Sequence, residues 1–274
     1  MPEGPELKFL SIFLKKYILN EKILNITALS KKKVYLPSVS KIIDVQSKGK
    51  LLWIQTQDYY IHIHLGITGW IYINEKPDYT KYIIETSKNI VYVDSMRKFT
   101  KLQVYTEKTH LAKLKKLNGD ILTSDFNIQY LINTLQSTNT IIASFLLKQN
   151  KFAGLGSRRK LCFQATIPSR EGNYIKNEAL YLAKINPKIK TNNIKLNQIK
   201  KLYKAIRYVA FSVLIGFIKD NNLKLSEEER KLIPKTLQIP YKYRVYGKTK
   251  DPKGNKIKKE KIGGRWTYYS KHNM

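Results

Sequence analysis

Hydrophobic residues recur with a helical period near the start of the chain. Between residues 7 and 18 they form one stripe, whereas Lys8, Lys15 and Lys16 lie off it. The stripe consists of Leu7, Leu10, Leu14, Tyr17 and Ile18. This spacing predicts an amphipathic helix.

Beyond this helix the hydrophobic period changes from helical to strand-like. The clearest alternation is in residues 60–65, where Ile61, Ile63 and Leu65 face one way. Short runs rich in Ile, Val, Tyr and Leu, with turn residues between many of them, occur at 23–29, 41–46, 51–56, 59–65, 81–86, 90–94 and 102–106. The first ~106 residues are therefore expected to form a helix followed by an antiparallel β-sandwich or barrel.

The pattern becomes helical again from about residue 108. The run 197–219 has an amphipathic start and an almost wholly apolar end, as expected of a central core helix. Helices are predicted at 108–117, 126–136, 140–149, 177–185, 195–220 and 226–231. The basic, glycine-containing stretch 241–274 predicts a hairpin that turns around Asp251-Pro252-Lys253-Gly254. These patterns define an α+β fold with three segments, 1–107, 108–240 and 241–274.

Charge narrows the classes of partner. The 274 residues contain 51 Lys and Arg against 20 Asp and Glu, which gives a formal net charge of +31. Such an excess implies a polyanionic partner; nucleic acid is favoured, and an anionic membrane surface is the alternative. No apolar run approaches the ~18–20 residues that span a bilayer, and residues 1–20 lack the order of a signal peptide.

Metal and disulfide chemistry is limited by the residues available. The single Cys162 excludes an intramolecular disulfide and a multi-cysteine zinc site. The four histidines are scattered along the chain: His62, His64, His110 and His272. The simplest interpretation is an intracellular protein without a structural metal. The sequence does not indicate its cellular compartment.

The N-terminal sequence Met1-Pro2-Glu3-Gly4-Pro5-Glu6 carries candidate chemistry. Removal of Met1 would leave Pro2 as a secondary amine with a reference pKa near ~8. A neutral amine can attack the anomeric carbon of a nucleoside and form a Schiff base, while Glu3 shuttles a proton. The alternative interpretation is structural, because Pro and Glu both suit the first turn of a helix.

This N-terminus resembles that of the formamidopyrimidine-DNA glycosylase and endonuclease VIII family, and Gly4 is more similar to the endonuclease VIII branch. Lys48-Gly49-Lys50 resembles the family's phosphate-binding strand, His64–Gly69 its HLGMSG loop, and Met96–Phe99 its PRRF loop. The resemblance implies that Lys50 binds a phosphate beside the lesion. It also implies that Ile67, Arg97 and Phe99 fill the gap left by an extruded base. Singly, each of these residues is equally consistent with an ordinary strand-end, core or turn position.

The helical segment is similar to the family's helix–two-turn–helix, with one departure. Residues 144–156 resemble its first part, and Asn173 with Glu178-Ala179-Leu180 its continuation, in which the asparagine contacts a phosphate. Between them lie 16 additional residues, 157–172. This insertion is either a tolerated loop, because closure entropy grows slowly with length, or a segment that damages DNA binding.

The C-terminal segment resembles the family's zinc finger without its cysteines. Val245-Tyr246-Gly247 and Gly263-Gly264-Arg265-Trp266-Thr267 match its edges, so a zincless β-hairpin finger is expected. Arg265 matches the arginine that grips phosphates beside the lesion, a contact suited to a planar guanidinium.

Together the resemblance implies a monomeric base-excision-repair DNA glycosylase and AP lyase. It would act on damaged double-stranded DNA, or alternatively on single-stranded DNA. It would remove oxidised bases, and oxidised pyrimidines are favoured over oxidised purines. Pro2 would be the nucleophile, Glu3 and Glu6 would assist, and β,δ-elimination would cut the strand. The resemblance also implies that no metal ion and no organic cofactor is needed. Two alternatives remain: a non-catalytic DNA-binding relative inactivated by residues 157–172, and an RNA-binding or ribosome-associated protein.

Overall fold

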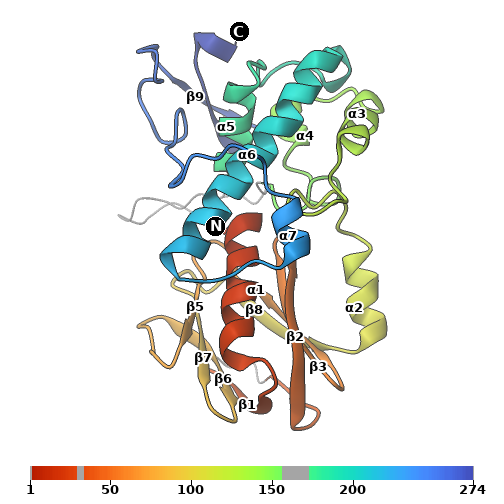
Figure 1. Cartoon of the computed structure of the whole chain (residues 1–274), viewed down its shortest axis with the longest axis vertical. Coiled ribbons are helices and arrows are strands. Elements are labelled where there is room, and N and C mark those ends of the chain that lie inside the picture. Colours follow the sequence, from red (N-terminus) through yellow and green to blue (C-terminus); the bar gives the residue numbers. More distant parts are fainter. Residues whose placement is uncertain (1, 30–33, 156–172, 274) are drawn as a thin grey trace. The chain divides into compact units, whose positions relative to one another are not determined.

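The computed structural model describes residues 2–29, 34–155 and 173–273 (Figure 1). The chain forms two compact units. The first consists of Met1–Pro2 and Glu6–Lys116, and the second of Glu3–Pro5 and Leu117–Met274. The insertion predicted at 157–172 lies outside the described residues.

The first unit is an antiparallel sheet with a helix alongside it. Its strands are β1 (Lys22–Ala28), β2 (Ser40–Lys48), β3 (Leu51–Thr56), β4 (Tyr60–His64), β5 (Ile71–Ile73), β6 (Thr80–Thr86), β7 (Ile90–Asp94) and β8 (Lys101–Tyr105). They are ordered β5-β7-β6-β1-β2-β3-β4-β8. Only Lys22–Lys41 and Ile23–Ser40 pair β1 with β2, so the order divides there into two four-stranded halves. This confirms the predicted α+β class; β5 was not predicted, because its three residues are too short to show a period.

Helix α1 (Gly4–Ile18) contacts both halves of this sheet. Lys15 pairs with Asp44 of β2 at 2.7 Å, and the backbone oxygen of Tyr17 accepts a hydrogen bond from Asn89, next to β7. The stripe residues Leu7, Leu10, Leu14 and Ile18 are almost fully buried. Tyr17, predicted to belong to the stripe, is 40% exposed. At about 100° per residue it lies roughly 80° from Leu7, at the edge of the buried face.

The first unit also includes α2 (Glu107–Leu114), whose packing explains its place there. Its only buried residue is His110, and the ring of His110 stacks on Tyr60 of β4 with centroids 4.0 Å apart. Nδ1 of His110 also lies 2.8 Å from Nε2 of His62.

The second unit is mainly helical. Its described helices are α3 (Ile128–Gln136), α4 (Ile142–Phe145), α5 (Tyr174–Leu182), α6 (Leu196–Asp220) and α7 (Glu227–Lys231), with 3₁₀ turns at Thr191–Asn193 and Lys271–Asn273. As predicted, the second half of α6 is mostly buried. The helix predicted at 140–149 is wrong beyond Phe145. There Leu147 and Lys148 donate to carbonyls three residues back, which makes successive turns.

The C-terminal hairpin turns later than predicted. Strands β9 (Lys258–Ile262) and β10 (Arg265–Tyr269) pair in register around Gly263 and Gly264, whose φ values are +62° and +80°. Positive φ at both central residues is the geometry of a type I′ hairpin turn, which glycine adopts without strain. The chain does turn at 251–254, but the pairing there is short: it consists of the bridge Lys250–Lys256 and the backbone hydrogen bonds Asp251–Asn255 and Ile257–Thr249. The Asp251 carboxylate accepts from the amides of Lys253 and Asn255 within this turn.

Among the described helices, none is long and apolar enough to cross a membrane.

Candidate active site

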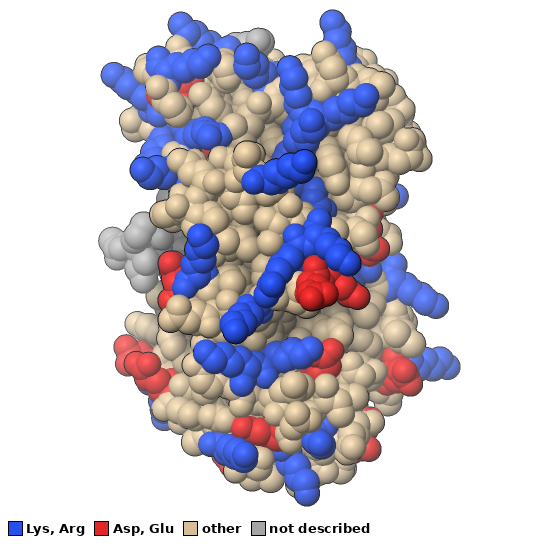
Figure 2. All heavy atoms as spheres, in the orientation of Figure 1, with Lys and Arg blue, Asp and Glu red and all other residues tan. Residues whose placement is uncertain are grey.

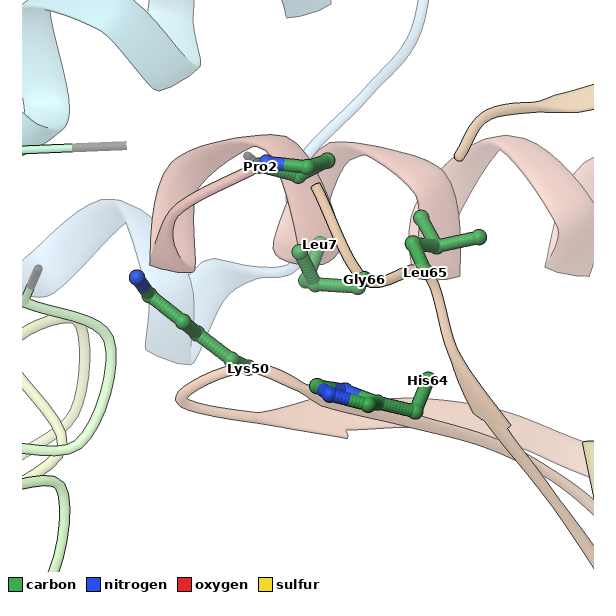
Figure 3. A pocket seen from close by; sticks show the side chains of 6 residues that line it. All are labelled: Pro2, Leu7, Lys50, His64, Leu65 and Gly66. Atoms are coloured by element: carbon green, nitrogen blue, oxygen red, sulfur yellow. The ribbon is translucent and has the colours of Figure 1, made fainter. Parts of the chain in front are cut away.

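Pro2 lies in a pocket of the first unit (Figure 3). The lining residues come from the N-terminal segment and from strand ends: Pro2, Leu7, Lys50, His64, Leu65 and Gly66. Figure 3 shows Pro2 and Leu7 on the α1 side, with Lys50 and His64 extending from the strand side. Lys50 sits in the tight β2–β3 turn after Gly49, whose φ is +57°. The structure therefore brings the predicted nucleophile and the predicted phosphate ligand Lys50 to one pocket.

Glu3 belongs to the second unit and is fully buried. Its Oε1 accepts a hydrogen bond of 3.0 Å from the backbone N–H of Tyr174, at the N-terminus of α5. Such a position stabilises a carboxylate, because the first amides of a helix carry partial positive charge.

The neighbouring Gly4 fixes this segment. Its N–H donates to the carbonyl of Gly154 at 2.9 Å, and a Cβ on Gly4 would lie 3.1 Å from the Cα of Gly154. Gly154 has a φ of +94°. This close backbone approach favours glycine at both positions.

The predicted supporting acid Glu6 lies in the first turn of α1 and is half-buried. It is not among the residues that line the Pro2 pocket.

The start of α5 holds strand β10 through three side chains. Asn173 donates to the backbone oxygen of Trp266, Lys176 donates to Oγ1 of Thr267 at 2.8 Å, and Asn177 accepts from the N–H of Tyr268 at 3.0 Å. Successive residues of β10 are thus bound to one helical turn. Because Arg265 begins β10, this contact relates the two predicted phosphate ligands Asn173 and Arg265.

The side chains of Asn173 and Arg265 are both buried. Asn173 is 3% and Arg265 4% exposed. Within the described residues, Oδ1 of Asn173 is buried and accepts no hydrogen bond. An unsatisfied buried acceptor costs about 1–3 kcal/mol, which is the kind of strain that functional sites retain.

Lys176 is a residue that the sequence interpretation missed. It is fully buried, and burial lowers the pKa of its ammonium to about 7; the charge of Glu3 opposes this shift, whereas that of Arg265 adds to it. Lysine is among the residues least often buried. The sequence signal was available: Lys176 falls three residues after Asn173, inside the motif that ends in Glu178-Ala179-Leu180.

Glu178 is the second residue with a role that was not predicted. Its carboxylate accepts four hydrogen bonds of 2.7–2.9 Å from the segment before the hairpin: Tyr241 Oη and the amides of Arg244, Val245 and Tyr246. Burial and this carboxylate raise the pKa of Tyr241. Beside this contact, Tyr181, Val245 and Ile257 form a small apolar cluster, with Tyr268 packed against it. The tail is thus attached to α5 by hydrogen bonds and apolar packing.

The residues predicted to fill the void left by a base lie on two adjoining loops of the first unit. The N–H of Arg97 donates to Oγ1 of Thr68 at 3.2 Å, next to Ile67. Phe99 is 43% exposed. An exposed aromatic ring beside a half-buried isoleucine is suited to insertion between bases.

The turn before the insertion is held by Gln149. Its Oε1 accepts from the N–H of Gly154 at 3.3 Å, and its Nε2 donates to the carbonyl of Leu155. These contacts lie within residues 144–156, the segment that resembles the first part of the helix–two-turn–helix. Residues 156–172, which follow directly, are outside the described part.

Within residues 2–29, 34–155 and 173–273, no three His, Cys, Asp or Glu side chains are grouped so that they could hold a metal ion. On the face shown in Figure 2, Lys and Arg side chains are spread more widely than Asp and Glu side chains. An excess of positive charge attracts polyanions.

Comparison with known proteins finds one group of relatives. The model of the formamidopyrimidine-DNA glycosylase N-terminal domain matches residues 1–102. Beyond this domain, the chain is similar along its length to formamidopyrimidine-DNA glycosylases. It is 29% identical to the formamidopyrimidine-DNA glycosylase of Ureaplasma parvum, an alignment that covers 98% of each chain. It is 27% identical to that of Pelotomaculum thermopropionicum over 98% of this chain and 97% of the relative.

The likeness to solved structures extends over almost the whole chain. A Lactococcus lactis FPG variant, solved in complex with DNA containing Fapy-dG, superposes with a TM-score of 0.78 over 98% of each chain. Its identity of 23% makes this a likeness of fold. Whether the chain is of the formamidopyrimidine or the endonuclease VIII type is not distinguished by these relatives.

Proposed function

We propose that this chain is a DNA glycosylase and AP lyase that removes damaged bases through a Schiff base on Pro2. The observation that carries the proposal is the position of Pro2, before α1 and in one pocket with Lys50. The dipole of α1 disfavours a positive charge on the amine, and the ammonium of Lys50 and the apolar Leu7 and Leu65 do the same. A Pro2 amine freed of Met1 is thereby favoured in its neutral, nucleophilic form.

The reaction proceeds by substitution and ring opening. The Pro2 nitrogen bonds to C1′ of the sugar as the glycosidic bond breaks and the base leaves. The cationic amine gives its proton to Glu3, which passes it to O4′ as the C1′–O4′ bond opens. The resulting iminium activates β- and δ-elimination, which break the C–O bonds to the 3′ and 5′ phosphates. Glu6 supports the charge of the site from the first turn of α1.

The same residues account for DNA binding. Lys50, Asn173 and Arg265 bind phosphates beside the lesion, and Ile67, Arg97 and Phe99 fill the space left when the base is flipped. The net charge of +31 supplies affinity for duplex DNA that is independent of base sequence.

Oxidised bases are the proposed substrates, with two classes to be compared. Gly4 and the cysteine-free hairpin favour oxidised pyrimidines. The names of the relatives and the Fapy-dG in the DNA of the Lactococcus lactis complex favour formamidopyrimidines. Cleavage rates on duplexes that differ only in the lesion decide between them.

A second candidate is a non-catalytic DNA-binding member of the family. The observation that favours it is the 16-residue insertion, which directly precedes the proposed phosphate ligand Asn173. This candidate retains affinity for DNA but forms no covalent intermediate.

Borohydride trapping separates the two candidates. The protein is incubated with duplexes that contain an abasic site, an oxidised pyrimidine or a formamidopyrimidine, and intact mass confirms the loss of Met1. We expect an adduct that maps to residue 2 and is weakened in Pro2→Gly. Tight binding without any adduct, in protein that has lost Met1, would reject the catalytic proposal in favour of the second candidate.

A further inference from the structure

Lys176 interacts electrostatically with two groups of the proposed chemistry, Glu3 and Arg265. It is on the first turn of α5, where the Tyr174 N–H donates a hydrogen bond to Glu3. Its Nζ donates a hydrogen bond to Thr267, two residues after Arg265. Glu3 and Lys176 are both 0% exposed. Charges in such an interior interact strongly, because little water screens them.

We propose that Lys176 is a positioning residue for Glu3, and that it couples phosphate binding at Arg265 to the positive charge that attracts the Glu3 carboxylate. A protonated Lys176 holds this carboxylate in place as the acceptor of the proton released by Pro2. This inference rests on the proposed function for its chemical consequence, but the coupling itself exists in the free protein.

The charges around Lys176 determine the direction of the coupling. Burial opposes protonation, Glu3 favours it, and Arg265 opposes it, so that the pKa of Lys176 falls to about 7. A phosphate bound to Arg265 would cancel part of the charge that opposes protonation. Lys176 would then take up a proton as DNA binds, and its positive charge would hold the Glu3 carboxylate when the substrate is in place.

A purely structural role for Lys176 is the alternative, because its hydrogen bond also holds β10. Thr267→Val removes this hydrogen bond and keeps the ammonium, so it serves as the matched control for Lys176→Met. If Lys176 only fastens β10, the two variants should behave alike.

The first test titrates Lys176 in the free protein by NMR of its side chain. We expect a midpoint near pH 7, lower in Glu3→Gln, because an attracting charge is lost, and higher in Arg265→Gln, because a repelling charge is lost. A midpoint that neither substitution moves would overturn the coupling, whether or not the protein binds DNA.

The second test measures proton uptake on binding a duplex with an uncleavable abasic-site analogue. Calorimetry at pH 7.5 in two buffers of different ionisation enthalpy gives the number of protons taken up. The wild type and Thr267→Val should take up roughly half a proton more than Lys176→Met. Equal uptake by Lys176→Met and the wild type overturns the link between DNA and Lys176. No DNA binding by the wild type, together with the expected NMR shifts, would reject the proposed function and leave the coupling in place.

The third test is the pH dependence of base removal. The wild-type rate should fall as pH rises above the titration of Lys176, because the neutral amine no longer attracts the Glu3 carboxylate. This alkaline limb should be absent in Lys176→Met and present in Thr267→Val. An alkaline limb that survives in Lys176→Met would reduce Lys176 to a structural residue.

Discussion

Gly66 and Phe99 are packed so closely that no side chain fits between them. A Cβ on Gly66 would lie 2.8 Å from Cβ of Phe99 and 2.9 Å from its backbone carbon, and Gly66 has a φ of +64°. The glycine therefore allows the loop that carries Ile67 to rest against the loop that carries Arg97 and Phe99. Two loops that are 30 residues apart in sequence depend on this contact for their relative position.

Gly66→Ala is expected to destabilise the first unit and displace the Phe99 loop. A left-handed φ costs a residue with a Cβ about 1–2 kcal/mol, and the overlap with Phe99 adds about 1–3 kcal/mol. Gly254→Ala is the matched control, since Gly254 has a φ of +79° and nothing within 4 Å of a Cβ. Denaturant unfolding should show the larger loss for Gly66→Ala; equal losses would mean that the contact with Phe99 is not restrictive.

Phe99→Ala is expected to reduce base removal with little effect on stability. The ring is 43% exposed, so its loss leaves no large cavity. If Phe99 fills part of an unstacked base step, its removal costs on the order of 1–2 kcal/mol, or roughly 5- to 30-fold in kcat/KM on a lesion duplex. Leu111→Ala on α2 is the control, since Leu111 is 47% exposed and lies outside both loops. Equal rates for the two variants would remove Phe99 from the proposed site.

The helices and strands could be predicted because the spacing of hydrophobic residues in each of them can be read from a short stretch of sequence. The stripe of α1 and the alternation of β4 were both visible in the sequence, and the structure confirms them. The hairpin was misplaced because Asp251-Pro252-Lys253-Gly254 is a strong turn signal. By contrast, Lys258–Ile262 is almost wholly charged and shows no alternation of apolar residues.

The site residues also fall into two groups: those that short motifs reveal, and those whose partners are remote in sequence. Pro2 and Lys50 could be proposed from short motifs, and the structure brings them to one pocket. Lys176 and Glu178 were missed because their partners are remote: Thr267 is 91 residues from Lys176, and the amides bound by Glu178 are 66–68 residues away. Charged residues in a helix are normally assigned to the surface, and only tertiary contacts show that these two are buried.

Glu178→Gln is expected to destabilise the second unit by about 3 kcal/mol. All four donors to Glu178 point at carboxylate oxygens, and an amide nitrogen in place of one oxygen leaves donors facing a donor. Glu260→Gln is the control, because Glu260 forms an exposed ion pair with Lys188. Its effect should be much smaller, since exposed pairs contribute little. A change in melting temperature no larger than that of Glu260→Gln would contradict the role of Glu178 in holding the tail.

The His62–His110 pair should make the first unit sensitive to acid. Nε2 of His62 lies 2.8 Å from Nδ1 of His110, and burial, followed by the charges of His110 and Lys113, lowers the pKa of His62 to about 4. An unfolded histidine titrates near 6.5, so between pH 6.5 and 4 the unfolded state binds more protons than the folded state. Stability contributed by neutral His62 is therefore complete above pH 6.5 and is lost as pH falls towards 4, by an amount on the order of 2 kcal/mol. His62→Phe keeps a ring against Trp53 and Tyr105 but cannot titrate. Its free energy of unfolding should depend less steeply on pH in this window, and an unchanged slope would exclude His62 as the acid-sensitive group.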